Sequence, residues 1–409
     1  SGHAVGKLAP AGWIARCDPD GQNVEILSNG YRNQYDIALN ADGEMFTYDA
    51  DMEYDQGLPW YRPTRVCHVT SGSEYGWRSG TGKWPAYYED SLPPVINIGP
   101  GSPTGITFGT GTAFPQRYQD ALYLLDWTFG TIYAIHLDAD GSSYTGTKEE
   151  FIWAKPLPVT DTVVGMDGAL YFTVGGRGTQ SALYRVVYRG DEATTTVAQE
   201  DDGADARSLR AELEAHHGHV SPGAVEAAWP HLASEDRFLR FAARIAVENQ
   251  PVNAWRARAL GETRPQALVT GLVALARQGE PSDLPAIAAA LGRLDLATLP
   301  EPVLLGALRA YTLAFTRLGQ PHETLRQEVL TVLEPLFPST SNAVGAEAAA
   351  LLVFLRSPAV VEQALTLMGQ DTPTELPPWA DLIQRNDTYG SPIARMLANM
   401  PPLQDIQYA

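Results

Sequence analysis

The chain has 409 residues, of which 44% are hydrophobic and 19% charged, values typical of folded soluble proteins. Its net charge of −19 argues against a nucleic-acid partner, because basic surfaces bind phosphate backbones. The length exceeds that of one ordinary core, so we expect two domains or one domain with a repeat array.

The first residues and the cysteines exclude several kinds of segment and site. The run SGHAVGKLAPAGW has no basic segment followed by an apolar one, so we recognise no signal peptide in it. No run approaches the roughly 18 apolar residues that a membrane-spanning helix needs. Cys17 and Cys67 lie outside CxxC and CxxCH motifs, so neither a zinc site nor a covalent haem is encoded. Both fall in strand-like segments, which leaves a disulfide between them open.

The residues before about 190 predict a β domain. They contain six of the nine tryptophans and fifteen of the eighteen tyrosines, in short runs rich in β-branched and aromatic residues. Asp-Gly turn signals separate these runs, and glycine provides the positive φ that a tight hairpin needs. Repeated units of strand, turn and strand predict propeller blades. The turn signals are DPDG at 18–21, NADG at 40–43, DADG at 138–141 and MDG at 166–168.

The densest chemistry lies between Gly30 and Trp84. Four carboxylates recur there at every second position, so a loop or bulged strand would project them in one direction. Such charges repel one another unless a cation lies among them. Calcium, which takes six to eight oxygen ligands, is one candidate, and ion pairs with nearby arginines are the alternative. The carboxylates are Asp49, Asp51, Glu53 and Asp55, and the arginines are Arg32, Arg62, Arg65 and Arg78.

Aromatic residues of the same stretch predict a second kind of site. Their rings would stack on a sugar if they form one platform, or pack between blades if they do not. The residues are Trp60, Tyr61, Tyr75, Trp77 and Trp84.

His68 follows Cys67 in the alternating run RVCHV, where one of the two neighbours must face the core. If the imidazole lines a central channel, its near-neutral pKa suits a general base. If it faces the core, it is a structural residue with satisfied ring nitrogens. The sequence leaves both alternatives open.

The second half of the chain predicts helices. Residues 191–206 (DEATTTVAQEDDGADA) are small, polar and acidic, as expected of a linker. From Arg207 onward, apolar residues recur at helical spacing, with Pro, Ser or Asp near the start of each run. Helix pairs at intervals of about forty residues predict a HEAT-like solenoid, the alternative being an irregular helical domain. The expected domains are a β-propeller at 1–190, a linker at 191–206 and HEAT-like helices at 207–409.

Several segments carry a resemblance to known families. Arg32-Asn33 followed by YDIALNADGEMF is similar to the GxRNPxD…DGxLW segment of soluble quinoprotein glucose dehydrogenase and the aldose sugar dehydrogenases, six-bladed propellers that use pyrroloquinoline quinone and calcium. The run PTGITFGTGTAFPQRYQDALYLLDWTFGTIYAIHL resembles another of their blades. TYDADMEYDQGLPWYRPTRVCHVTSGSEYGWRSGTGKWP, SLPPVINIGPGSPTG and LYRVVYRG resemble most the planctomycete-type "membrane-bound dehydrogenase" or haem-binding-domain proteins. In those, such a propeller precedes HEAT-type helices and usually a cytochrome c domain.

The resemblance implies a partial β-propeller of the quinoprotein glucose dehydrogenase type followed by a HEAT-like solenoid. It implies that Arg32 and Asn33 face the central channel and contact cofactor or substrate; their alternative role is to hold the blade turn through backbone hydrogen bonds. The residue patterns and the resemblance together give these expected site residues: His68, Arg32 and Asn33 for catalysis, Arg32, Asn33, Thr104 and Asp161 for the cofactor, Asp49, Asp51, Glu53 and Asp55 for calcium, and Trp60, Tyr61, Trp77 and Trp84 for sugar stacking.

The chain departs from the family pattern in three places. The catalytic histidine of the sugar dehydrogenases precedes the RNP segment, and the candidate here is His3. The arginines that hold the quinone carboxylates in those enzymes are replaced by PLPVTD at 156–161, which has Asp161 but no arginine. The sequence also lacks the CxxCH of the cytochrome found in longer relatives. These departures weigh against a bound quinone and against covalent haem in this chain.

Two hypotheses from different classes follow. The first is a part of an exported, periplasmic or cell-surface, quinoprotein-like dehydrogenase of sugars or other alcohols, with the helical repeats as scaffold. The second is a non-catalytic scaffold in which the propeller binds a glycan and the solenoid binds a protein. Because a blade takes about 40–50 residues, the first 190 residues provide roughly four, so we expect a piece of a longer protein. The expected partners are the missing propeller half or a partner chain, a cytochrome c domain or other electron acceptor, and a carbohydrate.

Overall fold

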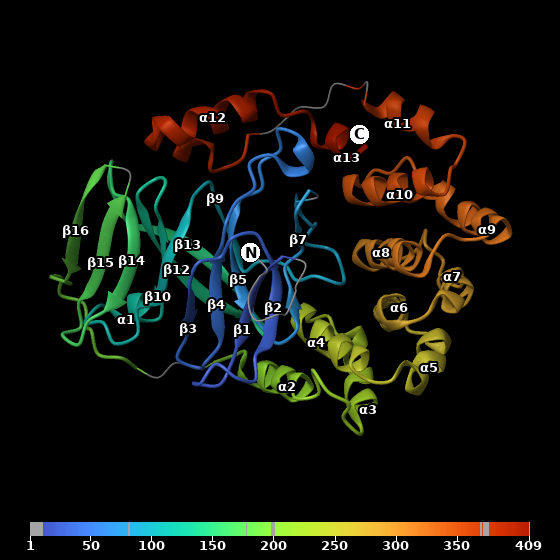
Figure 1. The fold of residues 1–409 in the computed structure, drawn as a ribbon, viewed down its shortest axis with the longest axis horizontal. Helices are drawn as coiled ribbons and strands as arrows, with labels where there is room; N and C mark the ends of the chain where they lie inside the picture. The colour runs from blue at the N-terminus through green and yellow to red at the C-terminus, as the bar shows by residue number, and fades with distance from the viewer. Residues whose placement is uncertain are drawn as a thin grey trace. The chain divides into compact units, whose positions relative to one another are not determined.

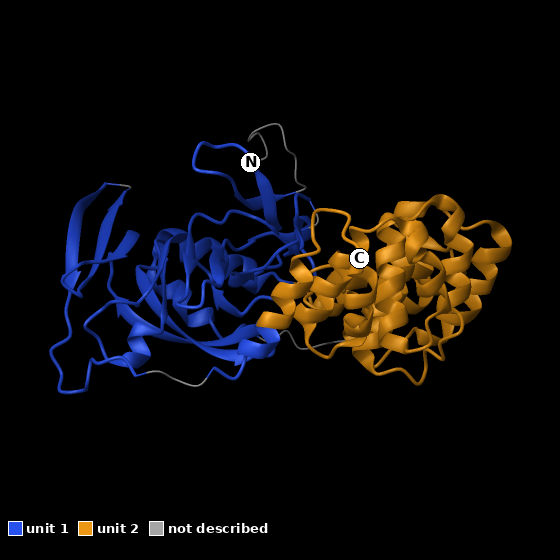
Figure 2. Ribbon diagram, turned by 90° about the horizontal axis from the view of Figure 1, so that it is seen from below, with its two compact units in different colours: residues 1–84, 93–207, 375–400 blue, residues 85–92, 208–374, 401–409 orange. Residues whose placement is uncertain are grey.

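The computed structural model describes residues 11–80, 82–176, 178–197, 201–368, 370 and 376–408. His3 and residues 198–200 of the expected linker lie outside the described residues. The chain divides into two compact units, which Figure 2 shows in different colours. The strand-bearing unit comprises residues 1–84, 93–207 and 375–400, and the helical unit comprises residues 85–92, 208–374 and 401–409.

Three sheets of the strand-bearing unit are built from antiparallel strands that pair in sequence order. The first sheet contains β3 (Ile37–Leu39), β4 (Met45–Asp49), β5 (Thr64–Val69) and β9 (Ile96–Gly99). The second contains β10 (Pro103–Phe108), β11 (Leu122–Asp126), β12 (Thr131–Asp140) and β13 (Ser143–Trp153). The third contains β14 (Val159–Val164), β15 (Leu170–Gly176) and β16 (Thr179–Val186).

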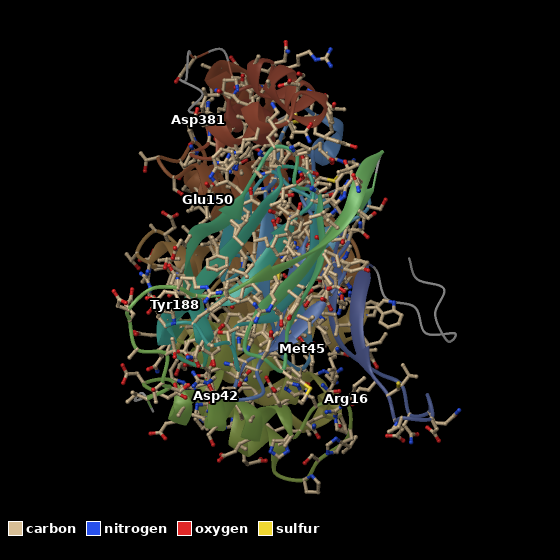
Figure 3. The ribbon with its side chains drawn as sticks, turned by 90° about the vertical axis from the view of Figure 1, so that its left-hand side faces the viewer. Arg16, Asp42, Met45, Glu150, Tyr188 and Asp381 are labelled. Carbon is tan, nitrogen blue, oxygen red and sulfur yellow. The ribbon has the colours of Figure 1, made fainter. Side chains whose placement is uncertain are left out.

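A smaller sheet precedes them. It contains β1 (Gly12–Arg16) and β2 (Glu25–Tyr31) as a hairpin, with the short β6 (Ser73–Glu74) parallel to β2, and β7 (Trp77–Arg78) pairs separately with β8 (Gly82–Lys83). Arg16 and Glu25 form an exposed ion pair of 2.8 Å at the end of the hairpin, where Figure 3 labels Arg16. Cys17, just beyond β1, and Cys67 on β5 are both free thiols, so the two cysteines do not form a disulfide.

The four predicted Asp-Gly turns connect paired strands. They join β1 to β2, β3 to β4, β12 to β13 and β14 to β15. Their glycines have φ angles between 56° and 82°, a region that glycine adopts without steric cost. The prediction of strand, turn and strand at these positions is therefore confirmed. The glycines are Gly21, Gly43, Gly141 and Gly168.

The three larger sheets pack against one another at their first strands. β10 lies beside β3 and beside β14, as Figure 1 shows. Phe46 and Phe108 belong to an apolar cluster shared by the first two sheets, and Leu125 and Phe172 to one shared by the second and third. Neighbouring propeller blades pack in this way. The chain therefore combines a β part with an α part as expected, and closure into a propeller stays a prediction.

The helices follow the strands in sequence. The strand-bearing unit contains the short α1 (Gln116–Gln119), and α2 (Ala204–Glu214) begins at its end. No helix among the described residues is both long and apolar enough to cross a membrane. The helices of the helical unit are α3 (Ala224–Ala228), α4 (Arg237–Glu248), α5 (Arg256–Gly261), α6 (Pro265–Gln278), α7 (Leu284–Leu291), α8 (Glu301–Leu318), α9 (Glu323–Leu333), α10 (Asn342–Phe354), α11 (Val360–Met368) and α13 (Leu403–Tyr408).

The expected capping residues begin several of these helices. The Asp236 carboxylate accepts the backbone N–H groups of Phe238 and Leu239 at the start of α4, and the Ser341 hydroxyl accepts that of Val344 in α10. Such caps satisfy N–H groups that have no partner within the helix.

Successive helices of the helical unit stack. α4, α6, α8 and α10 pack one on the next, and α5, α7 and α9 pack on α6, α8 and α10 respectively. One continuous apolar core runs through them and includes the fully buried Trp255 and Leu272. The stacking matches the expected helix pairs, and membership of the HEAT class stays a prediction.

Two segments depart from the expected domain boundaries. Residues 85–92 belong to the helical unit, although we expected them in the β domain. Residues 375–400, with η6 (Ala380–Arg385) and α12 (Asp387–Ala398), belong to the strand-bearing unit. The reason for the second departure is apolar packing, because Ile393 and Met396 of α12 share a buried cluster with Tyr61 and Phe129.

The stacked core makes a stability prediction with a matched control. Leu272→Ala removes a side chain that is 0% exposed, and we expect a loss of about 2–5 kcal/mol in the free energy of unfolding. Leu365→Ala makes the same change on α11 at a side chain that is 62% exposed, and we expect a change below about 0.5 kcal/mol. Chemical denaturation followed by circular dichroism measures both. Equal losses would contradict the observed packing of α6.

Candidate functional site

Asp49, at the end of β4, is the centre of a buried ionic network in the strand-bearing unit. One carboxylate oxygen accepts the backbone N–H groups of Arg32 and Asn33 at 2.9 and 3.1 Å. The other accepts Nε and Nη2 of Arg65 at 3.1 and 3.0 Å. Asp49 therefore holds the turn after β2 against the start of β5. The backbone role that we gave as the alternative for Arg32 and Asn33 is present.

Asp51 and Glu53 share the guanidinium of Arg32. Nη1 of Arg32 lies 3.2 Å from Asp51 Oδ1, and Nη2 lies 3.1 Å from Glu53 Oε2. The hydroxyl of Tyr61 donates a hydrogen bond to the second oxygen of Asp51. Burial raises the pKa of Asp51 to about 6, and the nearby Glu53 charge acts in the same direction.

Asp55, the last of the four carboxylates, connects the acidic loop to Arg62 and to the strand β8. Its carboxylate lies 3.1 Å from Nη1 of Arg62 and accepts the backbone N–H of Lys83 at 3.1 Å. Burial raises the pKa of Asp55, although Arg62 opposes this shift. Gly82 has φ of +59°, and a Cβ there would lie 1.3 Å from the Asp55 carboxylate. The close approach of the two segments therefore requires glycine at position 82.

The four carboxylates predicted to bind calcium are thus paired with arginines. No group of three or more His, Cys, Asp or Glu side chains within the described ranges is placed to hold a metal ion. The observed arrangement is the ion-pair alternative, in which each carboxylate has an arginine partner: Asp49, Asp51, Glu53 and Asp55. The donor set therefore does not fit calcium in this arrangement, and calcium binding by the chain stays a prediction.

Lys83 is a member of this network that the sequence did not point to. Its ammonium is buried and donates to the carbonyl oxygens of Ala50 and Pro63, both at 2.7 Å. Burial lowers the pKa of Lys83 to about 7, and the nearby Arg65 charge adds to this effect. A Gly-Lys dipeptide carries no local signal for such burial, so only the fold reveals it.

His68 is fully buried on β5. Its Nε2 lies 2.7 Å from Glu44 Oε2, its Nδ1 lies 2.9 Å from Ser143 Oγ, and its ring stacks on Phe46 with centroids 5.0 Å apart. Both ring nitrogens have protein partners and the side chain is 0% exposed. The hypothesis of a channel-lining general base is therefore not supported, because a substrate cannot reach this imidazole. His68 takes the structural role that we gave as the alternative.

The predicted aromatic residues contact different neighbours instead of forming one platform. Trp60 lies under the guanidinium of Arg62 at 4.6 Å, and Trp84 under that of Arg78 at 4.4 Å. Tyr61 is buried against Trp379, with ring centroids 4.8 Å apart. Trp77 lies on β7 and pairs with Lys83 across the short hairpin.

Thr104 and Asp161 lie on the neighbouring strands β10 and β14. The Thr104 hydroxyl donates to the carbonyl oxygens of Leu125 at 3.2 Å and of Val159 at 2.9 Å. Asp161 is exposed, and a Cβ on Gly105 would lie 2.8 Å from its Oδ1. The structure therefore brings Thr104 and Asp161 close together, while the Arg32 guanidinium is held by Asp51 and Glu53.

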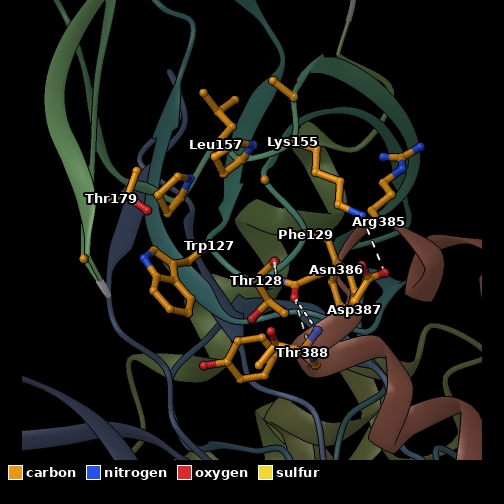
Figure 4. Close-up of a pocket in the computed structure, with 16 residues that line it drawn as sticks. Trp127, Thr128, Phe129, Lys155, Leu157, Thr179, Arg385, Asn386, Asp387 and Thr388 are labelled. Carbon is orange, nitrogen blue, oxygen red and sulfur yellow. Dashed lines mark hydrogen bonds and ion pairs between the residues drawn. The ribbon is translucent and has the colours of Figure 1, made fainter.

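A cavity of about 550 Å³ lies elsewhere in the strand-bearing unit, and sequence reasoning did not anticipate it (Figure 4). Among the described lining residues, an indole ring lies with hydroxyl and amide groups, a lysine, an arginine and an aspartate. Four separate parts of the sequence contribute to it, which explains why no local motif revealed it. Its lining residues are Trp127, Thr128, Phe129, Gly130, Ala154, Lys155, Pro156, Leu157, Pro158, Gly176, Thr179, Arg385, Asn386, Asp387, Thr388 and Tyr389.

Asp126 positions the turn that carries Trp127. Its carboxylate is 0% exposed and accepts the backbone N–H groups of Ser102, Thr128 and Phe129 at 2.8, 3.0 and 3.2 Å. Burial raises the pKa of Asp126 to about 7, although these hydrogen bonds oppose the shift. The indole Nε1 of Trp127 donates to the carbonyl of Gly175 at 2.9 Å, which fixes the ring.

The opposite wall of the cavity is formed where α12 begins. Asn386 caps this helix and also donates through Nδ2 to the carbonyl of Thr128 at 2.6 Å. The guanidinium of Arg385 donates to Glu150 at 2.9 Å and lies 4.7 Å from the ring centroid of Trp153. Figure 4 shows Lys155 directed toward Asp387, 3.6 Å away. Both cations of the wall are thus paired with carboxylates.

The cavity includes Pro156–Pro158, part of the segment at which the family resemblance places the quinone carboxylates. A quinone with three carboxylates needs cations whose charge is not already neutralised. The two cations described in this wall, Lys155 and Arg385, each face an acid. The described lining residues therefore do not fit such a quinone, and their hydroxyl, amide and indole groups suit an uncharged polar ligand.

Comparison with known proteins gives only distant likenesses. No protein-family model and no curated protein matches the sequence. Among solved structures, the chain is similar to an oxidoreductase described as a glucose dehydrogenase from Thermus thermophilus, at 20% identity over 39% of this chain and 47% of that one, with a TM-score of 0.32. It is also similar to the quinone-bound aldose sugar dehydrogenase of Streptomyces coelicolor, at 15% identity over 42% and 51%, with a TM-score of 0.33.

A further glucose dehydrogenase matches at 18% identity over 40% of this chain and 43% of that one, with a TM-score of 0.30. The chain thus spans about half the length of these solved structures. Likenesses at such identities and TM-scores say nothing about a reaction of this chain.

The Asp49 network makes a prediction about buried and exposed ion pairs. Arg65→Met leaves the Asp49 carboxylate buried without its guanidinium, and we expect a loss of about 3–5 kcal/mol in the free energy of unfolding. Arg185→Met is the control, because Arg185 pairs with Asp167 at the surface, where we expect little measurable change. Urea denaturation of both variants tests this. A small loss for Arg65→Met would mean that Asp49 is satisfied by backbone groups alone.

The buried Asp126 makes a prediction about pH. Its pKa is about 7 in the folded chain and near its ordinary value of about 4 when unfolded, so the folded state binds more protons between these values. The Asp126 contribution to stability is therefore largest below about pH 4 and is lost as the pH rises toward about 7.

Asp126→Asn removes the titrating carboxyl and with it this pH-dependent contribution. The free energy of unfolding of the parent chain should therefore fall, relative to that of the variant, between about pH 4 and about pH 7. Denaturation midpoints at several pH values measure it, with Asp161→Asn on the exposed face of β14 as the control. A difference that does not vary with pH would show that Asp126 is ionised in the folded chain throughout this range.

Proposed function

We propose that the strand-bearing unit is a carbohydrate-binding module of an exported protein, and that the cavity beside Trp127 is its binding site. The observation that carries this proposal is the composition of the cavity, which places a fixed indole beside hydroxyl and amide groups in about 550 Å³. An aromatic face with a few directed polar groups is the combination that recognises sugar rings.

The charges around the cavity favour a neutral ligand. Lys155 faces Asp387 and Arg385 faces Glu150, so binding an anionic sugar would require breaking one of these pairs. The hydroxyl groups of Thr128, Thr179 and Thr388 line the same space. A neutral mono- or disaccharide, or another polyol, is the ligand class that these groups would take, with the helical unit serving as a scaffold for protein contacts.

The second candidate is a part of a quinoprotein-like dehydrogenase of sugars or other alcohols. The sequence resemblance favours it, whereas the paired cations of the cavity wall at Lys155 and Arg385 weigh against its quinone. Arg32 and Asn33 belong to the turn that this hypothesis uses, and a partner that completes the propeller would have to supply the base, since His68 is buried. Dye reduction by the chain with added quinone, calcium and sugar would favour this candidate over the binding module.

Titration calorimetry with neutral mono- and disaccharides tests the binding site. Trp127→Ala should weaken sugar binding about tenfold or more, because the indole provides the stacking face. Trp60→Ala is the matched control, since Trp60 lies against Arg62 and outside the cavity, and it should bind sugars as the parent chain does. Loss of binding in Trp60→Ala but not in Trp127→Ala would move the site to the predicted aromatic platform.

A further inference from the structure

We propose that the inner face of α4, α6, α8 and α10 is a binding surface for a short peptide that forms turns and carries two aromatic residues followed by two acidic residues. Residues 85–92, PAYYEDSL, occupy this surface in the chain as a built-in ligand. The proposal is independent of the cavity beside Trp127.

Glu89 is held by the first two helices of this face. Its carboxylate lies 3.1 Å from Nη1 of Arg237 and accepts both Nε and Nη2 of Arg240 at 3.3 Å. Gln266 of α6 donates to it at 3.3 Å. Position 306 of α8 is a glycine, and a Cβ there would lie 2.8 Å from Cγ1 of Val269 on α6 and 3.1 Å from Cγ of Glu89. The glycine therefore gives the peptide close access to the helix.

Asp90 is held by the next helix in the stack. It accepts Nε and Nη2 of Arg309 at 2.8 and 2.9 Å, the two-pronged geometry that gives arginine its specificity for carboxylates. Nη1 of Arg277 lies 3.8 Å from its Oδ2. Burial acts to raise the pKa values of Glu89 and Asp90, but the facing arginines outweigh it and the net shift is downward. Both acids thus bind as carboxylates.

The two tyrosines extend the contact to α10. The hydroxyl of Tyr87 donates to Glu347 at 2.9 Å, and that of Tyr88 donates to its other oxygen at 3.3 Å. The guanidinium of Arg309 lies 3.8 Å from the ring centroid of Tyr88, a cation–π contact. One short segment therefore contacts all four helices α4, α6, α8 and α10, as ligands do on the concave faces of stacked-helix proteins.

The helices also bind the main chain of the peptide. Nη2 of Arg237 donates to the carbonyl oxygens of Tyr88 and Ser91, the latter at 3.0 Å. Because the N–H of Ser91 also donates to the carbonyl of Tyr88 at 3.2 Å, the arginine contacts a turn of the peptide. The surface therefore recognises the backbone as well as the acidic side chains.

The charge balance of the face calls for an acidic ligand. The helices contribute five arginines and two carboxylates, a balance of 5 − 2 = +3, and Glu89 with Asp90 reduces it to 3 − 2 = +1. Such a basic face is unusual in a chain of net charge −19. The arginines are Arg237, Arg240, Arg244, Arg277 and Arg309, and the helix carboxylates are Glu248 and Glu347.

Because the built-in segment is part of the same chain, its effective concentration at the surface is far higher than that of a separate peptide. A second molecule with the same motif can therefore bind only where the built-in segment is weakened. This gives a direct test in the full chain.

Glu89→Gln/Asp90→Asn weakens the built-in segment and leaves every arginine in place. A fluorescently labelled peptide PAYYEDSL should bind this variant at least tenfold more tightly than it binds the parent chain, measured by anisotropy. The unlabelled peptide should also raise the melting temperature of the variant by about 2–4 °C at concentrations several times its Kd, and leave that of the parent unchanged.

Two controls separate recognition from non-specific binding. The peptide PAYYQNSL should bind neither chain, and adding Arg309→Met to the variant should abolish binding of PAYYEDSL. If the double variant does not fold by circular dichroism, Asp90→Asn alone takes its place with the same expected order of affinities. A folded variant that fails to bind PAYYEDSL, or that binds both peptides equally, would overturn the proposal.

Discussion

The geometry of the strand-bearing unit depends on the cost of burying a carboxylate. Asp49 is 0% exposed, and an unpaired charge at such a position would cost several kcal/mol. It is satisfied by two backbone N–H groups after β2 and by Arg65 on β5, so three chain segments must meet around it. Asp126 and Asp90 obey the same rule with other donors, namely backbone N–H groups and Arg309. These three acids therefore have a structural role inside the fold.

This constraint changes what an acid-rich sequence means for function. Alternating carboxylates such as Asp49 and Asp51 have the oxygen chemistry of a calcium loop, yet arginines from neighbouring segments compete for the same oxygens. In the described residues the arginines take those positions, and their ion pairs join the loop to β5 and to the turn after β2. The cavity beside Trp127 lies apart from this loop, and there Lys155 and Arg385 are paired with acids while threonine residues contribute to the lining.

The features that could be predicted from the sequence are those with local signals. The Asp-Gly turns and the helical spacing of apolar residues depend on neighbours within a few positions, and both gave correct elements. The cavity could not be predicted, because Thr128 meets Asn386 only in the folded chain, with 258 residues of sequence separation between them. The burial of His68 could not be decided from the sequence for a similar reason. The alternation of a strand does not reveal which of its two faces is buried, and the partner Ser143 comes from a distant part of the sequence. Lys83 had no local signal at all.

The placement of residues 85–92 also bears on how this sequence can evolve. These eight residues lie between β8 and β9, yet Glu89 and Asp90 find their partners on α4 and α8. A charge change in the segment is tolerated only with a matching change on those helices, so substitutions in the two should be correlated across related chains. The segment should therefore vary together with the helices and not with the strands on either side of it, and recombination that exchanges the strand region alone would break the match.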